Sequence, residues 1–167
     1  NLLTDENDLT DQAKLDQITV YIPKYMGGAE SLHRIPKMPN LKLVQVLTAG
    51  YDDVLPLIPE GVTLANARGL HDLSTAELTL TLTLASKARV SDLIASQSSQ
   101  HWLRHVRDSI IDASVAIVGY GSVGQEIGRV FLPFTQNITG YTRSGSNGTK
   151  KISKLDAELN QYDIVIL

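Results

Sequence analysis

Residues 115–124 read VAIVGYGSVG and decide how the chain is interpreted. The first four form a continuous apolar run, as expected for a strand that is buried on both faces. Beyond them Val123, Ile127 and Phe131 recur at helical spacing until Pro133 ends the pattern. The G-x-G-x-x-G pattern therefore lies between a strand and a helix. In that context it indicates a dinucleotide-binding loop rather than a glycine-rich turn that binds nothing.

Each residue of this loop has a mechanical role in such a fold. Gly119 makes the tight turn, Gly121 lets the backbone approach a pyrophosphate, and Gly124 lets helix and strand pack closely. The helix N-terminus presents unpaired N–H groups and a partial positive charge to the anion. We therefore expect Ser122 and Val123, together with the three glycines, to bind the pyrophosphate of a cofactor.

The end of the next strand, residues 138–142, favours one nicotinamide cofactor over the other. A dinucleotide fold that uses NAD places an acid about 20 residues past the loop, where it holds the adenosine ribose hydroxyls. Here that position is Thr142, followed by Arg143 and Ser144. Arg143 can pair with a 2′-phosphate and Ser144 can add a hydroxyl, so NADP is favoured and NAD is possible.

Three lysines follow this strand, with no acid between Arg143 and Asp156: Lys150, Lys151 and Lys154. This composition predicts a positive local field, which would suit a phosphate. A solvated basic loop has the same composition, so the lysines alone do not distinguish the two.

The earlier part of the chain alternates apolar runs with short helical patterns. Runs over residues 18–22, 41–47 and 62–65 predict strands, and residues 54–58 predict a short helix. Strands that alternate with short helices indicate parallel βαβ units. Residues 1–16 are acidic and predict a solvated helix or tail.

Two central segments are less clear. Residues 78–84 alternate Leu and Thr, which favours a strand, but Ser74-x-x-Glu77 is a capping-box signature that favours a helix. We predict a helix whose leucines are buried between two units. Residues 91–107 predict an irregular helix anchored by Trp102 in the core or at an interface.

The composition limits the classes of molecule that the chain is expected to bind. The 167 residues are 43% hydrophobic and 20% charged with a formal net charge of -3. This charge gives no broad footprint for nucleic acid or anionic lipid, so we expect small-molecule partners. The absence of cysteine excludes thiolate chemistry and disulfides, and no metal site is predicted. No apolar run reaches the ~18 residues of a membrane span, and an acidic start is unlike a secretion signal, so a cytoplasmic protein is expected.

Taken together, three motifs in this order resemble the D-isomer-specific 2-hydroxyacid dehydrogenase family. Residues 47–52 (LTAGYD) resemble its substrate loop, and residues 118–124 (VGYGSVG) resemble its phosphate loop. Between them, residues 66–69 (NARG), residues 74–77 (STAE) and Arg89 resemble the segment that leads into the cofactor domain.

The resemblance implies an α/β protein with a flavodoxin-like substrate domain over residues 1–70, incomplete at its N-terminus. A Rossmann doubly wound parallel sheet follows over residues 71–167, of which only the first half is expected. It also implies that the main-chain amides of Ala49 and Gly50 bind the substrate carboxylate and that Thr75 lies near the cofactor. The resemblance further implies a homodimer, with the leucine-rich segment 78–84 as a dimer element.

The activity implied is hydride transfer between NAD(P)H and a small 2-oxoacid or D-2-hydroxyacid such as glyoxylate or hydroxypyruvate. The family's catalytic arginine, acid and histidine lie beyond the third strand of the nucleotide domain, where this chain is expected to end. No catalytic residue is therefore assigned, and the chain alone is predicted to be inactive. His33, His101 and His105 are expected at the surface, and His71 in a cleft without a direct role. Phosphoglycerate dehydrogenase, formate dehydrogenase and a non-catalytic NAD(P)-sensing corepressor remain alternatives.

Overall fold

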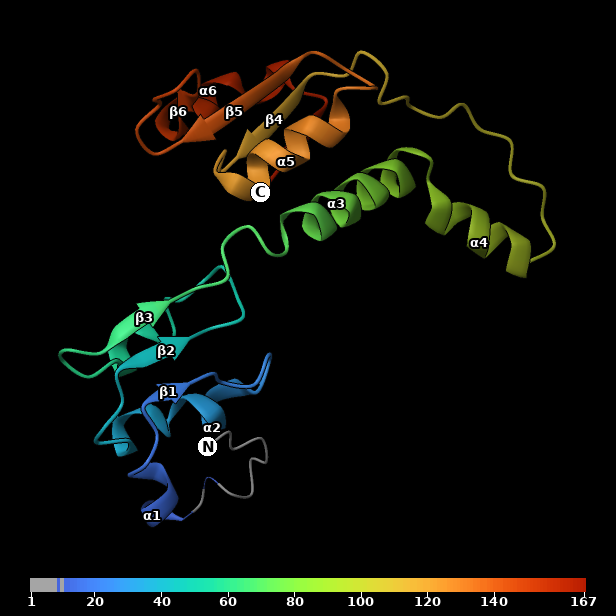
Figure 1. Cartoon of the computed structure of the whole chain (residues 1–167). Helices are drawn as coiled ribbons and strands as arrows, with labels where there is room; N and C mark the ends of the chain where they lie inside the picture. The colour runs from blue at the N-terminus through green and yellow to red at the C-terminus, as the bar shows by residue number, and fades with distance from the viewer. Residues whose placement is uncertain (1–8, 10) are drawn as a thin grey trace. The chain divides into compact units, whose positions relative to one another are not determined.

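The computed structural model describes residue 9 and residues 11–167, which form two compact units, one that ends at residue 71 (unit 1) and one over residues 72–167 (unit 2). Both units contain a parallel sheet accompanied by short helices (Figure 1). This arrangement confirms the α/β class. Most of the acidic segment 1–16 lies outside the described residues. Its last part forms helix α1 (Gln12–Leu15), whose N-cap Asp11 accepts a hydrogen bond from the Ala13 N–H.

Unit 1 is built on a three-stranded sheet in the order β1-β2-β3. The strands are β1 (Val20–Tyr21), β2 (Leu43–Gln45) and β3 (Thr63–Ala65), each inside a predicted apolar run. Val44 pairs with Tyr21 on one side and Leu64 on the other, and it is fully buried. Besides α1, the helices are α2 (Gly28–Leu32) and the 3-10 helices η2 (Ile35–Lys37) and η3 (Leu55–Leu57).

The sheet of unit 2 has the order β6-β5-β4-β7. Its strands are β4 (Val115–Val118), β5 (Ile138–Thr142), β6 (Lys150–Lys151) and β7 (Ile164–Ile166). The chain runs outward from β4 to β6 and then returns to β7 on the other side of β4. Numbered along the chain this order is 3-2-1-4, the start of a doubly wound sheet.

The expectation that the chain ends on the third strand is therefore wrong, because it ends on the fourth. The third strand, β6, consists of two lysines and has no apolar signal. The strand order reverses between β4 and β7. In open α/β sheets that reversal creates a crevice outside the carboxyl ends of the strands, where ligands bind.

Side chains of this sheet alternate between two cores. On one face Val115 and Ile117 pack with Ile127 and Phe131 of α5 (Ser122–Phe131). On the other face Ala116 and Tyr141 pack with Leu155. Leu155 opens α6 (Leu155–Glu158), which lies between the 3-10 helices η4 (Ile152–Lys154) and η5 (Leu159–Gln161).

Residues 72–87 form helix α3 (Asp72–Lys87), which confirms the predicted helix over the Leu-Thr alternation. Thr79, Thr81 and Thr83 each donate their hydroxyl to a main-chain carbonyl four residues earlier, at 2.8 Å. The main-chain carbonyls of the helix accept these threonine hydroxyls, so the threonines are compatible with a helix and do not require a strand. The capping-box prediction is wrong, because the helix begins at Asp72 and Ser74 lies inside the first turn.

The leucines of α3 are largely exposed within this chain. Ala76 is buried and Leu80 packs against the core shared with α5, but Leu78, Leu82 and Leu84 are 57%, 60% and 40% exposed. A two-residue alternation sends leucines to all sides of a helix, and α5 covers only one side. The expectation that they are buried is wrong for this chain.

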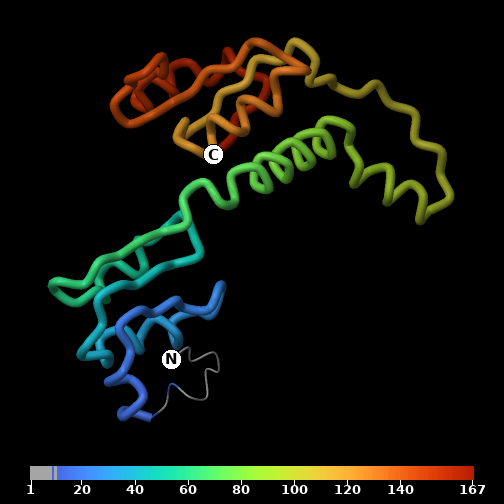
Figure 2. The backbone as a smooth tube through the Cα atoms, in the orientation of Figure 1, coloured from blue at the N-terminus to red at the C-terminus, as the bar shows by residue number. Residues whose placement is uncertain are grey.

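Helix α4 (Val90–Ser98) ends earlier than predicted, and residues 101–110 have no regular structure as the chain returns to β4 (Figure 2). Gln100 has φ 55, and the His101 N–H donates to Ser96 O at 2.9 Å, a Schellman ending. Glutamine replaces the usual glycine there, so no glycine marks the end of the helix in the sequence. Trp102 is 83% exposed, which excludes the predicted place in the core.

Candidate nucleotide and substrate sites

The glycine loop between β4 and α5 uses its first three N–H groups internally. Gly119 and Tyr120 donate to Tyr141 O at 2.9 and 3.1 Å, and Gly121 donates to Gly119 O at 2.8 Å. Gly119 has φ 86, a conformation that favours glycine. The first turn of a helix has N–H groups without intrahelical partners, and in α5 these are the amides of Ser122, Val123 and Gly124, because the first bond back from the helix runs from Gln125 N–H to Gly121 O. The main-chain donors available to an anion are therefore these three amides, which include those of Ser122 and Val123.

Packing inside the chain leaves no room for a side chain at one of the loop glycines, but leaves room at another. A Cβ added to Gly124 would lie 2.4 Å from Gly119 O, so a side chain there collides with backbone. A Cβ on Gly121 would meet nothing within 4 Å. Packing inside the chain therefore requires Gly124 but not Gly121. The open space beside Gly121 fits a residue whose backbone is approached by a ligand, and the loop fits a dinucleotide.

Tyr120 was not expected to matter, yet its ring fills the space between α5 and β5. A Cβ on Gly140 would lie 2.3 Å from its Cγ, and one on Gly128 would lie 2.6 Å from its hydroxyl oxygen. The two glycines make room for the ring, which fixes the loop against the sheet. Gly128 and Gly140 inside a helix and a strand were the signal available in the sequence.

Asp72 is a second residue that sequence reasoning missed. Its carboxylate accepts a hydrogen bond from the Ser122 hydroxyl, which ties the start of α3 to the phosphate loop. The Ser122 hydroxyl is thereby engaged, and its main-chain N–H is the group that can meet an anion. Thr75 lies exposed in the same first turn of α3. The 50 residues that separate Asp72 and Ser122 left no local signal.

The loop after β5 is closed by its own side chains. The Thr142 hydroxyl accepts from the Gly145 N–H at 3.0 Å and bonds to the Thr149 hydroxyl at 2.8 Å. The Ser144 and Ser146 hydroxyls lie 2.8 Å apart. Arg143 is exposed and makes no ion pair with any residue that the structure describes. Thr142 thus shapes the loop, and Arg143 is the group available to a ligand.

Lys150 is not part of an uncompensated positive field. Its ammonium pairs with Glu158 at 2.7 Å, and the buried Tyr141 donates its hydroxyl to the same carboxylate at 2.5 Å. The Tyr162 hydroxyl lies 2.8 Å from that of Tyr141. The hydrogen bonds from Lys150 and then Tyr141 lower the pKa of Glu158. Burial and the hydrogen bond to Glu158 raise the pKa of Tyr141.

In unit 1 the predicted substrate loop follows β2. The Thr48 hydroxyl donates to Gly50 O at 2.7 Å, and the Asn66 side-chain amide donates to Ala49 O at 2.8 Å. Ala49 and Gly50 are exposed, and neither N–H donates to another part of the chain that the structure describes. Two adjacent unengaged amides after a strand suit a carboxylate.

A cavity of about 250 Å³ lies beside this loop, lined by Pro23–Gly28 after β1, by Val46–Thr48 after β2, and by Ser31, Leu32, Asp53 and Val54. The residues after β1 were missed, although parallel strands bring their carboxyl ends to one edge.

His71 lies 3.2 Å from Leu47 O and its ring is 5.6 Å from that of Tyr25. His33 and His101 are exposed as predicted, but both ring nitrogens of His105 are buried without a hydrogen-bond partner among the described residues.

Comparison with known proteins decides the family. Residues 80–167, more than half of the chain, match the family model of the D-isomer specific 2-hydroxyacid dehydrogenase, NAD binding domain. The chain belongs to the D-isomer-specific 2-hydroxyacid dehydrogenase family. Members of this family are NAD(P)-dependent oxidoreductases. The family resemblance found in the motifs of the sequence is confirmed.

Two curated relatives match the chain over part of their length. It is 28% identical over 145 residues to glyoxylate reductase of Thermococcus kodakarensis, covering 77% of this chain and 44% of the relative. It is 30% identical over 111 residues to D-3-phosphoglycerate dehydrogenase of Methanocaldococcus jannaschii, covering 64% and 21%. The chain spans less than half the length of either relative.

A solved structure shares the fold. The NADPH-dependent glyoxylate/hydroxypyruvate reductase from Sinorhizobium meliloti, in complex with NADP and sulfate, matches with a TM-score of 0.74 at 23% identity. The match covers 94% of this chain and 52% of that one. Among the described residues of the chain, no helix is long and apolar enough to span a bilayer.

Proposed function

We propose that the protein reduces a small 2-oxoacid, such as glyoxylate or hydroxypyruvate, to the D-2-hydroxyacid with NADPH. The observation that carries the proposal is the glycine loop after β4, at the edge where the strand order reverses, with Gly124 packed against Gly119 O. Bound NADPH supplies the hydride. The relatives named glyoxylate reductase and hydroxypyruvate reductase support this substrate class.

Within this proposal the two units divide the work. Unit 1 is the substrate domain, in which the Ala49 and Gly50 amides bind the carboxylate of the oxoacid. Unit 2 is the first part of the nucleotide domain, in which the amides of Ser122 and Val123 bind the pyrophosphate and Thr75 lies near the cofactor. We assign no residue of 1–167 to proton transfer, so this chain alone is expected to show no turnover.

The preference for NADP rests on Arg143 and Ser144 at the end of β5. A guanidinium pairs well with a phosphate, and Arg143 has no competing ion pair in the part of the chain that the structure describes. An NAD-specific site would place a carboxylate here instead, and Thr142 has none.

The test is cofactor affinity in the full-length protein. A charge-assisted hydrogen bond contributes about 1.5–3 kcal/mol, so Arg143→Ala is expected to weaken NADPH binding about 10- to 150-fold. NADH binding is expected to change little. Thr142→Asp combined with Arg143→Ala is expected to reverse the preference, because the new carboxylate repels the phosphate and accepts the ribose hydroxyls.

Arg129→Ala is the matched control, since Arg129 is another exposed arginine of unit 2 and pairs with Glu126 at 2.6 Å. It is expected to leave both affinities unchanged. Equal losses of NADH and NADPH binding in Arg143→Ala would show that Arg143 supports the loop instead of reading the phosphate.

A second candidate substrate has its own support, because the phosphoglycerate dehydrogenase relative is 30% identical. Steady-state turnover of glyoxylate and hydroxypyruvate with NADPH, against 3-phosphoglycerate with NAD, separates the two. Faster phosphoglycerate oxidation would replace the proposed substrate class and the NADP preference together.

The protein is a cytoplasmic homodimer in this proposal, and the exposed leucines of α3 support the dimer. Leu78, Leu82 and Leu84 present apolar surface that another copy can cover. Sedimentation of the full-length protein and of a Leu78→Glu, Leu82→Glu variant tests the dimer. A wild-type monomer would rule it out.

A further inference from the structure

We propose that Lys151 is a second cation for the 2′-phosphate of the cofactor, placed there by a strand of the sheet and not by the loop after β5. This inference rests on the proposed use of NADPH. Its basis is the register of the sheet, the contact of Lys151 with the loop after β5, and the different partner of its neighbour Lys150.

The register places Lys151 in line with the phosphate loop. Val118 pairs with Tyr141, and Tyr141 pairs with Lys150, so the next row across the sheet holds Gly119, Thr142 and Lys151. This row lies at the carboxyl ends of parallel strands, and neighbouring strands are about 4.8 Å apart. The backbone of Lys151 is therefore one strand from the residue that precedes Arg143, at the edge where a dinucleotide binds.

Consecutive residues of a strand point to opposite faces, and this separates the two lysines. Lys150 points to the face of Tyr141 and α6, where Glu158 neutralises its charge at 2.7 Å. Lys151 points to the other face, which carries Gly140 and α5. The phosphate-binding turn of α5 begins on that same face.

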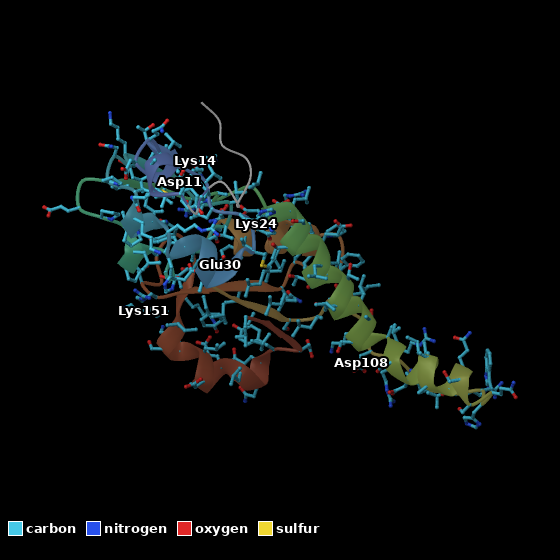
Figure 3. The ribbon with its side chains drawn as sticks, turned by 90° about the horizontal axis from the view of Figure 1, so that it is seen from below. Asp11, Lys14, Lys24, Glu30, Asp108 and Lys151 are labelled. Atoms are coloured by element: carbon cyan, nitrogen blue, oxygen red, sulfur yellow. The ribbon has the colours of Figure 1, made fainter. Side chains whose placement is uncertain are left out.

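The side chain of Lys151 lies against the loop that carries Arg143 and Ser144. A Cβ on Gly145 would be 2.7 Å from Lys151 Cγ and 2.8 Å from its main-chain nitrogen, so the stem runs past Gly145. Gly145 has φ 70, and because it has no Cβ it leaves room for the lysine stem. Lys151 is exposed on β6 (Figure 3) and pairs with no acid among the described residues.

These positions define a two-cation site. A phosphate monoester carries a charge of about -1.5 to -2 near neutral pH, more than one guanidinium neutralises. Arg143 approaches it from the loop after β5 and Lys151 from β6, with the Ser144 hydroxyl between them in the chain. The same lysine has no group to meet on NADH, so it acts on cofactor choice and not on pyrophosphate binding.

The test uses the full-length protein and two pairs of probes, NADPH with NADH and 2′,5′-ADP with 5′-ADP. Lys151→Met keeps the apolar stem and removes the charge. We expect it to weaken NADPH and 2′,5′-ADP binding about 5- to 20-fold, less than Arg143→Ala, because an ammonium lacks the bidentate geometry of arginine. NADH and 5′-ADP binding should be unchanged, and Lys151→Arg should retain NADPH binding.

Lys154→Met is the matched control, because it removes the same charge three positions away, on the side where Lys154 acts on Glu158. It should leave the NADPH to NADH ratio unchanged. Equal effects of Lys151→Met and Lys154→Met, or equal losses of NADPH and NADH, overturn the role of Lys151. If Arg143→Ala alone shifts the ratio, the inference fails and the proposed NADP preference stands. If the wild-type protein binds NADH more tightly than NADPH, both fail.

Discussion

The two turns that follow an inner strand of each sheet, residues 119–124 in unit 2 and 48–50 in unit 1, both contain glycine but are held in different ways. Gly119 needs a positive φ, and a Cβ on Gly124 would collide with Gly119 O. Gly50 has no positive φ, and a Cβ on it would meet nothing within 4 Å. The turn at Gly50 is held by side chains, from Thr48 within it and Asn66 beyond β3.

The difference explains why one turn can be recognised from its sequence and the other only from the fold. A turn that depends on glycine backbone is specified within a few residues, and its sequence pattern can be interpreted without knowing the fold. A turn that depends on a donor 17 residues away is specified only once the sheet has brought the two together. The two turns should therefore respond differently to substitution.

The largest effect is expected from Gly124→Ala. The added methyl group meets a main-chain oxygen at 2.4 Å, which cannot rotate away. Overpacking of this kind costs about 1–3 kcal/mol, occasionally more, and exceeds the gain of up to about 1 kcal/mol from replacing a helical glycine. Urea unfolding of wild type and variant measures the net loss.

Gly121→Ala is the control, since its Cβ enters open space. It should change the free energy of unfolding far less, while NADPH binding weakens if a pyrophosphate approaches that backbone. A Gly124→Ala variant as stable as wild type would break the comparison, because the loop would then not depend on its glycine.

Removing a distant side chain tests the other turn. Asn66→Ala deletes the hydrogen bond to Ala49 O and is expected to lower the free energy of unfolding by about 1 kcal/mol. Because the turn is proposed to bind the substrate carboxylate, the KM for the oxoacid should rise as well, with a smaller change in NADPH affinity.

Asn137→Ala is a matched control, because Asn137 also donates its amide to a main-chain carbonyl, that of Asp112, at 3.0 Å. It should cost a similar stability without raising KM. If both variants raise KM equally, Asn66 acts through general stability and not through the turn.

The same distinction between local and distant specification accounts for what the sequence predicted. Strands β4 and β5 and helix α5 were found because their apolar periodicity is local. Strand β6 was missed because two lysines carry no such pattern, and its place depends on β5 and Glu158. The end of α4 was missed because Gln100 adopts the conformation usually taken by glycine.

The site divides in the same way. The phosphate-loop residues were proposed from one short motif, whereas the contact of Asp72 with Ser122 joins residues 50 positions apart. The cavity beside residues 47 and 48 depends on the loop after β1, on a different strand. Chemistry contributed by a neighbouring strand cannot be recognised until the order and register of the strands are known.

A smaller effect is expected from the side-chain network that holds β6. Glu158 has its pKa lowered from the ordinary value of 4.5, chiefly by the hydrogen bond from Lys150. A lowered folded-state pKa stabilises the fold above the unfolded value, and the contribution is lost as pH falls through the folded value. The melting temperature of wild type should therefore drop below about pH 4.5 more steeply than that of Glu158→Gln. Asp156→Asn, which alters a carboxylate outside this network, should keep the wild-type slope.

The smallest effect is expected from Gly50→Ala, the counterpart of the first prediction. Its Cβ has open space and the backbone needs no positive φ, so the folded turn accepts alanine. Alanine also restricts the unfolded chain, which at compatible positions stabilises by about 0.4–1 kcal/mol. Urea unfolding should therefore show an unchanged or slightly raised free energy of unfolding. The N–H of residue 50 is retained, so the KM for the oxoacid should stay close to wild type.

A loss of stability as large as that of Gly124→Ala would show that this turn also depends on glycine backbone, and the contrast between the two turns would be lost. Unchanged stability with a large rise in KM would instead show that the substrate passes directly over the Cα of Gly50. The carboxylate site would then resemble the pyrophosphate site, because in both a ligand would approach the backbone of a glycine.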